Sequence, residues 1–171
     1  MFIHRIVSGG QTGVDRAALD AAMAANMPVG GWCPKGRRAE DGVIDARYPL
    51  AETPRRSPLQ RTRWNVRDSD ATLILTDEVT PAGGTAETIH FAQRLRKPTL
   101  VIDPASSGAP AAILGWEATI RPGVLNIAGP RESKRPGVYA ASLALLSAVL
   151  QALMPKPGDS LQDAADSALT L

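Results

Sequence analysis

The residues best suited to chemistry lie in three polar, glycine-containing turns, each between an apolar run and a helix-like stretch. They are Ser8-Gly9-Gly10-Gln11-Thr12-Gly13, a turn ending in Gly83-Gly84-Thr85, and a turn through Gly129, Pro130 and Arg131. Glycine lets the backbone approach a ligand closely because it has no Cβ. A helix that follows such a turn presents unpaired N–H groups and the positive end of its dipole. The turns therefore indicate a site for an anion such as phosphate.

The same turns have a simpler interpretation, in which the glycines only reverse the chain. The first turn matches neither the dinucleotide fingerprint nor the Walker lysine loop. Thr12 and Thr85 either donate to a phosphate or cap their helices. Arg16 either folds back to the anion or lies on a solvated face. Glu87 is either a general base at the pocket edge or a carboxylate in the first turn of a helix.

A local excess of positive charge also favours an anionic ligand. Residues 35–67 hold nine Lys or Arg against four Asp or Glu. Lys35 and Arg37 either pair with phosphate or remain solvated. The run 61–65, which includes Arg63 and Asn65, places two bases beside an indole and an amide that could cover a planar heterocycle. No aromatic and basic alternation of the RNA-binding kind occurs, so we expect no nucleic-acid partner.

Few residues are suited to metal or thiol chemistry. The single cysteine, Cys33, excludes an intrachain disulfide and is interpreted as a small buried hydrophobe. His4 and His90 lack the spacing of a metal pair, so we predict no metal site. Trp64, Trp116 and Tyr139 are interpreted as core or interface residues.

The composition is that of one ordinary globular domain. The 171 residues are 44% hydrophobic and 21% charged, with a net charge of +2. No run of eighteen apolar residues occurs, so we expect no membrane span, and the N-terminus lacks a signal-peptide layout. We predict a cytoplasmic protein with one domain over residues 1–154. A C-terminal tail follows at 155–171, for which partial order is left open.

Apolar runs alternate with Ala-rich stretches, which predicts an α/β fold with a parallel sheet. Strands are expected over residues 2–7, 29–33, 71–76, 99–102 and 124–127, and helices over 15–26, 59–68, 86–96, 110–119 and 138–153. The stretch 34–57 is too long for an ordinary connection, so we expect it to be functional or lid-like. Because ligands bind at the carboxyl ends of the strands, the turns at Gly9, Gly83 and Gly129 should converge on one crevice.

Longer motifs carry a family resemblance that covers roughly residues 3–152. The chain reads SGGQTGVDRAALD from Ser8 and GGWCPKGRRAEDG from Gly30. Further matching pieces are ET at Glu52, RTRWNV at Arg61, DSDAT at Asp68, GGT at Gly83 and NIAGPRES at Asn126. In this order the motifs resemble those of the molybdenum carrier family, which is related to the lysine-decarboxylase-like, cytokinin-activating proteins.

The resemblance implies a Rossmann-like, doubly wound parallel sheet, a dimer or tetramer, and binding of the molybdenum cofactor (molybdopterin). That ligand is a phosphorylated pterin, and molybdoenzymes would be its recipients. Its phosphate would sit on the turn Gly9–Gly13, which includes Gly10 and Gln11, with Thr12 and Thr85 donating. The remaining expected contacts are Arg16, Lys35, Arg37 and Arg63 for charge, Asn65 or Asn126 for the pterin edge, and the turn residues Gly83, Gly84, Gly129 and Arg131.

The related proteins also suggest an alternative, a protein that binds a nucleoside 5′-monophosphate. It would be either a phosphoribohydrolase-like enzyme or a nucleotide sensor. The enzymes use a Pro-Gly-Gly-x-Gly-Thr-x-x-Glu motif, whereas this chain reads Pro81-Ala82-Gly83-Gly84-Thr85-Ala86-Glu87. Glu87 falls two residues after Thr85 rather than three, which moves a side chain by about 100° around a helix. A binding protein is therefore favoured over an enzyme.

Overall fold

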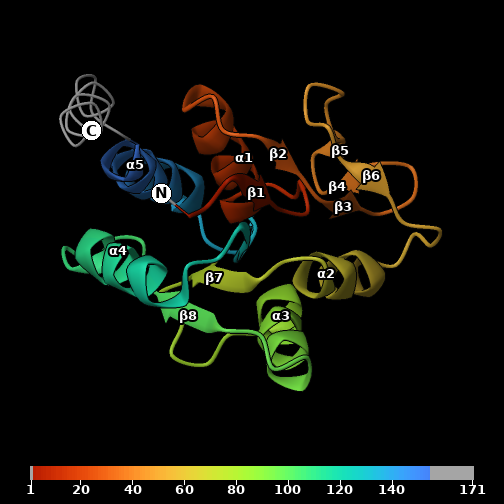
Figure 1. Ribbon diagram of the computed structural model, residues 1–171. Coiled ribbons are helices and arrows are strands. Elements are labelled where there is room, and N and C mark those ends of the chain that lie inside the picture. The colour runs from red at the N-terminus through yellow and green to blue at the C-terminus, as the bar shows by residue number, and fades with distance from the viewer. Residues whose placement is uncertain (1, 155–171) are drawn as a thin grey trace, which may run out of the picture.

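A five-stranded parallel sheet forms the centre of the protein, in the order β2-β1-β9-β7-β8 (Figure 1). Its strands are β1 (Arg5–Val7), β2 (Val29–Gly30), β7 (Ala71–Leu75), β8 (Thr99–Ile102) and β9 (Val124–Ala128). The computed structural model describes residues 2–154, and the predicted tail at 155–171 lies outside them. The predicted α/β fold is confirmed, and all five expected strands contribute to this sheet.

Helices cover both faces of the sheet. One layer holds α1 (Val14–Ala24), α4 (Ala109–Ile120) and α5 (Val138–Leu153), with α5 packed against the other two. The other layer holds α2 (Pro58–Arg67) and α3 (Gly83–Arg94), which pack against each other (Figure 1). This is the doubly wound, Rossmann-like arrangement that the sequence predicts.

The packing of the core explains why the strands and helices with the clearest hydrophobic patterns were predicted correctly. Strand β7 is buried at every residue, as a central strand of a parallel sheet must be. Helix α5 buries Leu145, Leu146, Val149 and Leu150, a spacing that keeps one apolar stripe facing inward. These side chains join Ile6, Leu73 and Ile127 of the sheet in the main core.

The strand order is that of a Rossmann sheet with a shifted starting point. If the chain began at β9, the strands β9, β1, β2, β7 and β8 would be numbered one to five. The sheet order would then read 3-2-1-4-5, as in the dinucleotide-binding fold. In this numbering the order reverses between β9 and β7, so the carboxyl ends of β1, β9 and β7 border the expected ligand crevice.

The strand expected over 29–33 is split into two strands that belong to different sheets. Gly31 lies at φ 124°, and a Cβ there would stand 2.2 Å from the Ser8 carbonyl oxygen. The chain therefore turns at Gly31, and β3 (Trp32–Cys33) pairs with β6 (Ala51–Glu52) in a separate two-stranded sheet. This break comes from tertiary packing, which hydrophobic patterning does not report.

Residues 34–57, here called the 34–57 segment, contain regular structure. They contain the hairpin β4 (Arg38–Ala39) and β5 (Gly42–Val43), besides β6. A second apolar cluster of Leu19, Cys33, Ile44, Tyr48 and Leu50 fixes the segment to α1. Cys33 is buried there, which confirms its interpretation as a small hydrophobe.

The expected second glycine turn is wrong as a turn at residues 83–85. Helix α3 begins at Gly83, so Gly83, Gly84 and Thr85 form its first turn, after extended Ala82. Gly83 lies at φ 56°, in the left-handed region where glycine is favoured because it has no Cβ.

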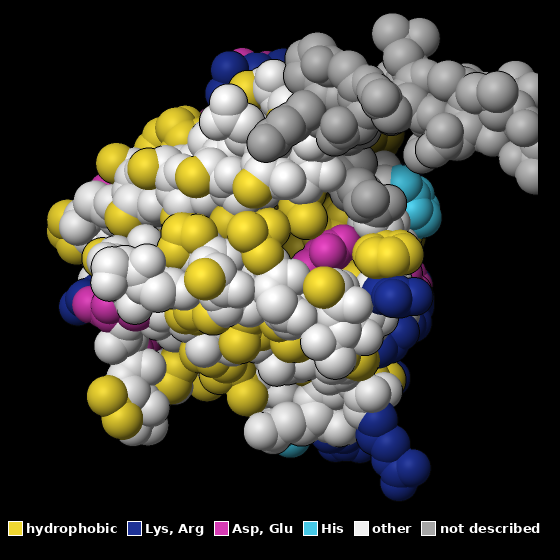
Figure 2. Space-filling view, turned by 60° about the vertical axis from the view of Figure 1, so that its left-hand side comes forward, with side chains coloured by type: hydrophobic (Ala, Val, Ile, Leu, Met, Phe, Trp, Pro, Cys, Tyr) yellow, Lys and Arg dark blue, Asp and Glu magenta, His cyan; other side chains and the backbone are white. Residues whose placement is uncertain are grey.

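The side of the molecule formed by α4 and α5 carries many hydrophobic side chains. Figure 2 shows them spread over that side, with most charged side chains near its edges. The predicted homo-oligomer stays a prediction. Within residues 2–154, no helix is both long and apolar enough to cross a membrane.

Candidate functional site

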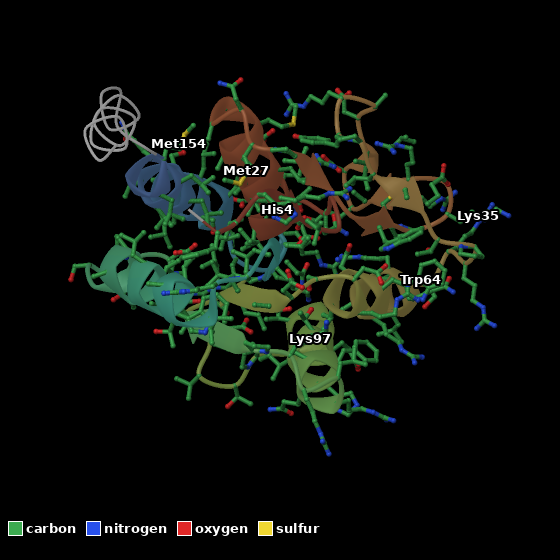
Figure 3. The ribbon with its side chains drawn as sticks, in the orientation of Figure 1. His4, Met27, Lys35, Trp64, Lys97 and Met154 are labelled. Carbon is green, nitrogen blue, oxygen red and sulfur yellow. The ribbon has the colours of Figure 1, made fainter. Side chains whose placement is uncertain are left out.

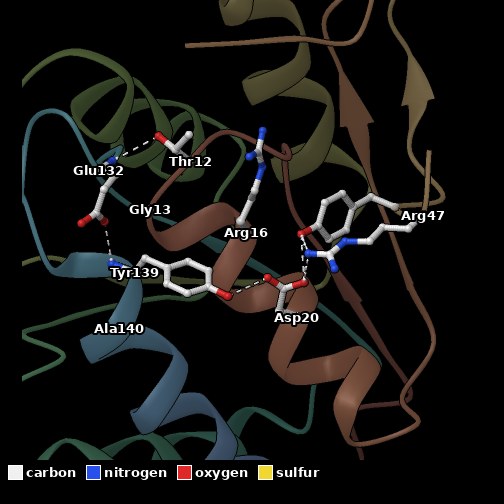
Figure 4. Close-up of a pocket in the computed structure, with 9 residues that line it drawn as sticks. Thr12, Gly13, Arg16, Asp20, Arg47, Glu132, Tyr139 and Ala140 are labelled. Atoms are coloured by element: carbon white, nitrogen blue, oxygen red, sulfur yellow. Dashed lines mark hydrogen bonds and ion pairs between the residues drawn. The ribbon is translucent and has the colours of Figure 1, made fainter. Parts of the chain in front are cut away.

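A pocket of about 450 Å³ opens beside the turns that follow β1 and β9 (Figure 4). Its walls come from these two turns, α1, the 34–57 segment and the start of α5. The lining residues are Thr12, Gly13, Arg16, Asp20, Arg47, Tyr48, Glu132, Tyr139 and Ala140. Three of them, Thr12, Gly13 and Arg16, belong to the site predicted from the sequence.

At one end of the pocket, several side chains surround Asp20. Both tyrosines of the chain donate to its carboxylate, Tyr48 at 2.9 Å and Tyr139 at 2.8 Å (Figure 4). Arg47 also donates to it, at 3.0 Å. Burial, and then the hydrogen bond to Asp20, raise the pKa of Tyr139 to about 12. The pocket therefore presents two neutral aromatic hydroxyls around one carboxylate.

Glu132 joins the first turn to helix α5. Its backbone N–H donates to Thr12 Oγ1 at 3.2 Å, and its carboxylate accepts from the Tyr139 N–H at 2.9 Å. A carboxylate at a helix N-terminus satisfies an N–H group that has no partner within the helix. The contact fixes Tyr139 at the pocket wall.

The turns after β1 and β9 are in direct contact, as expected. A Cβ at Gly13 would lie 2.5 Å from the Pro130 carbonyl oxygen, and the Val14 N–H donates to that oxygen at 3.3 Å. A Cβ at Gly129 would lie 2.4 Å from the Leu75 carbonyl oxygen. These glycines allow chain segments to pack closely at the carboxyl edge of the sheet.

The glycines expected in a turn at residues 83–85 do not contact the other two turns. Nothing lies within 4 Å of a Cβ built on Gly83 or Gly84. The loop before them is connected to the β9 side by an ion pair between Asp77 and Arg135. The expected convergence therefore applies to the turns at Gly9 and Gly129 only. Gly83 and Gly84 belong to helix α3, which begins before the residue expected.

An ion pair lies behind the first turn. Arg61 Nη1 stands 3.1 Å from Asp15 Oδ2, and a Cβ on Gly9 would overlap Arg61. Burial raises the pKa of Asp15, and the charge of Arg61 opposes that rise. Asp15 is thus a buried carboxylate in the first turn of α1, and Arg61 is its partner from α2.

The tip of the β4–β5 hairpin, Glu40 and Asp41, lies on the first turn. Asp41 forms a two-pronged ion pair with Arg16, with Nη2 2.8 Å from Oδ1. Glu40 accepts hydrogen bonds from the hydroxyls of Thr12 and Ser133. Gln11 holds the tip as well, since its Oε1 accepts from the N–H of Glu40 at 2.9 Å.

Other predicted cations do not reach the pocket. The guanidinium of Arg37 donates to four backbone carbonyls, those of Ile44, Asp45, Tyr48 and Leu50. Its hydrogen bonds hold the 34–57 segment together. Lys35 is exposed at the outer end of that segment (Figure 3), and Arg63 is exposed on α2.

The predicted amides are buried among protein atoms. Asn65 accepts from the Trp32 N–H at 2.7 Å and donates to the Trp32 carbonyl at 3.0 Å. Asn126, on β9, donates to Thr72 at 3.3 Å. Thr85 is buried on α3, as are Thr88 and Ala92. Glu87, half-buried on the same helix, does not line the pocket.

Sequence reasoning missed the aromatic end of the pocket. Asp20 follows Arg16 by one helical turn, so their shared face was a usable signal. No spacing connects Tyr48 or Tyr139 to Asp20, because the three residues come from different elements. Within the described part of the chain, no group of three or more His, Cys, Asp or Glu side chains could hold a metal ion.

Comparison with known proteins decides the family. Residues 6–150 match the circularly permutated YpsA SLOG family, cpYpsA. The chain belongs to this family. The permuted strand order of the sheet is the structural counterpart of the cpYpsA description.

A solved structure supports the same assignment. It is that of a "putative molybdenum carrier protein" from Syntrophus aciditrophicus SB, 47% identical to this chain with a TM-score of 0.81. The match covers 86% of this cpYpsA chain and 95% of the other. No curated protein matches.

Proposed function

We propose that this cpYpsA protein binds and carries the molybdenum cofactor, a phosphorylated pterin, and performs no chemistry on it. The observation that supports this most is the composition of the pocket. One end offers a hydroxyl and a guanidinium, Thr12 and Arg16, and the other offers Asp20 between two tyrosines. A relative named as a molybdenum carrier makes this cofactor the first ligand to test.

The chemistry of the pocket fits the two parts of that ligand. Phosphate is an acceptor of hydrogen bonds, which Thr12 and Arg16 can donate. A pterin ring carries N–H donors on one edge, which a carboxylate such as Asp20 can accept. The tyrosine rings supply apolar surface for a planar heterocycle. Arg47, whose side chain is 57% exposed, lies at the mouth, where it can draw in an anion.

A carrier needs shape and charge and no general base. It holds its ligand away from water and releases it to molybdoenzymes, which are the proposed recipients. Lys35, Arg37, Arg63 and Asn65 do not line the pocket, so the proposal rests on Thr12, Gly13, Arg16, Asp20 and the two tyrosines. A homo-oligomer remains part of the proposal.

The decisive experiment is an anaerobic titration of the full chain with purified molybdenum cofactor. Adenosine and cytidine monophosphates are added as competitors in the same titration. Micromolar or tighter binding that the nucleotides do not displace supports the carrier. Absence of cofactor binding, or displacement at similar concentrations, overturns it, and displacement favours the nucleoside monophosphate alternative.

A pair of variants tests whether the ligand binds in the pocket. Asp20→Asn keeps the size of the side chain and removes its charge, and Asp103→Asn makes the same change outside the pocket lining. We expect cofactor affinity to fall at least about tenfold for Asp20→Asn, the loss of one charged hydrogen bond. Equal affinities in the two variants would remove the pocket from the proposal.

A further inference from the structure

We infer that Thr12, Ser133 and Arg131 form a subsite for a tetrahedral oxyanion, and that the carboxylate of Glu40 occupies it as an internal substitute. The inference deepens the proposed function and rests on it for the identity of the whole ligand. The subsite itself follows from the contacts of the hairpin tip, Glu40 above all, whatever the whole ligand is.

Four donors surround the Glu40 carboxylate. Thr12 and Ser133 donate from their hydroxyls, and the Ser133 N–H donates at 3.1 Å. Arg131 Nε stands 3.5 Å from the same carboxylate. Two hydroxyls, a backbone N–H and a guanidinium form the kind of donor set that binds phosphate in proteins. Three of these donors come from the turn after β9 and one from the turn after β1.

The neighbouring residue of the tip repeats the pattern. Asp41 binds Arg16, which is the cation of the pocket lining nearest the first turn. The two residues of the hairpin turn thus place two carboxylates on the donors that an anionic ligand needs. Burial would raise the pKa of Glu40, but hydrogen bonds from Ser133 and Thr12 outweigh it, so the pKa is lowered. The groups that contact Glu40 and Asp41 are therefore suited to bind a negative charge.

The tip of the β4–β5 hairpin can move away from the subsite. Its strands β4 and β5 have two residues each, and a hairpin of that size is marginal without tertiary contacts. Gly42 lies at φ 121° with nothing within 4 Å of a built Cβ. Arg37 and Ile44, on either side of the hairpin, are fixed to the segment and its core. The tip can therefore move while its base stays in place.

The consequence for binding is competition. A tetrahedral oxyanion must displace the Glu40 carboxylate to reach Thr12, Ser133 and Arg131. The anion can be inorganic phosphate, molybdate or the phosphate ester of a larger ligand, since all three share the tetrahedral, negatively charged oxygens.

The test measures binding of inorganic phosphate and, separately, molybdate to the full chain by calorimetry. Glu40→Ala vacates the subsite, and we expect affinity for the preferred anion to rise at least tenfold over wild type. Glu78→Ala removes the same charge from the loop after β7 and should leave the affinity unchanged. Adding Ser133→Ala to Glu40→Ala should cancel the gain. No gain for either anion, or a gain that survives Ser133→Ala, overturns the subsite.

A second measurement uses the wild-type chain and does not depend on how the variants fold. Saturating phosphate or molybdate should speed hydrogen exchange at residues 39–43 while slowing it near Ser133, because the tip leaves and the anion enters. Slower exchange in both regions overturns the inference.

The two proposals fail differently. If Glu40→Ala gains phosphate or molybdate affinity but the cofactor does not bind, the carrier function falls and the subsite stands. If the cofactor binds and Glu40→Ala gains nothing, the subsite falls and the carrier function stands.

Discussion

The hydroxyl of Tyr139 donates to Asp20 at 2.8 Å, from the start of the last helix to the middle of the first. Tyr48 donates to the other oxygen of the same carboxylate, so Asp20 joins α1, α5 and the 34–57 segment. Since the chain has two tyrosines and both make this contact, tyrosine spectroscopy reports directly on the pocket.

That contact predicts a pH dependence. Burial and the Asp20 hydrogen bond raise the pKa of Tyr139 from 10.0 to about 12 in the folded protein, so folding favours the neutral hydroxyl. Its stabilising contribution is complete below pH 10.0 and is lost as the pH rises toward about 12. Ultraviolet titration should show this late ionisation, and Asp20→Asn should lower the midpoint. A midpoint at the ordinary value in wild type would contradict the contact.

Arg61→Met should destabilise the protein strongly. It leaves the buried Asp15 carboxylate without its partner, a change that costs about 3–5 kcal/mol. Arg63→Met, two residues along the same helix and exposed, is the matched control and should stay within about 0.5 kcal/mol. Urea unfolding of both variants measures the difference. Similar midpoints would show that the ion pair contributes little.

Arg37→Ala should loosen the 34–57 segment. It removes hydrogen bonds to four carbonyls, and each such bond from a charged donor contributes about 1.5–3 kcal/mol. We expect hydrogen exchange over residues 44–50 to accelerate, whereas Arg38→Ala, at an exposed neighbour, should leave it unchanged. Any loss of ligand affinity in Arg37→Ala should then persist at high salt, because it arises from the altered segment.

Two glycine substitutions should change the stability of the fold in opposite directions. A methyl group on Gly129 would meet the Leu75 carbonyl oxygen at 2.4 Å, so Gly129→Ala should cost about 1–3 kcal/mol. Gly84 is helical, and a built Cβ there has open space, so Gly84→Ala should stabilise by up to about 1 kcal/mol. Thermal unfolding checks both. If Gly84→Ala instead abolished ligand binding, α3 would have to be returned to the site.

The sequence predicts the sheet and its helices well where one pattern dominates. The fully buried β7 and the long apolar stripe of α5 are recognisable because burial of those residues depends on their own hydrophobicity. The split at Gly31 is different, since it depends on the Ser8 carbonyl, more than twenty residues earlier. The hydrophobic pattern of a short stretch of sequence gives no information about that distant contact.

The residues that line the candidate pocket were also predicted only in part, because some of their contacts join distant parts of the chain. Thr12, Gly13 and Arg16 lie in a recognisable turn and the helix that follows it, and they line the pocket. Arg37 had the sequence signature of an anion-binding residue, yet its partners are backbone carbonyls that only the folded segment gathers. Glu40 has no sequence signal of its own, because its partners lie on two turns that are distant in the chain.

The shifted starting point of the sheet has a consequence for synthesis on the ribosome. Thr12 emerges early, while its partner Glu132 follows 120 residues later, on the far side of β9. Long sequence separation of this kind delays closure of the contact. A nascent chain therefore displays its first turn and hairpin tip before the β9 turn and Tyr139 exist. Under the proposed function, the pocket is complete for its ligand only once translation has passed the start of the last helix.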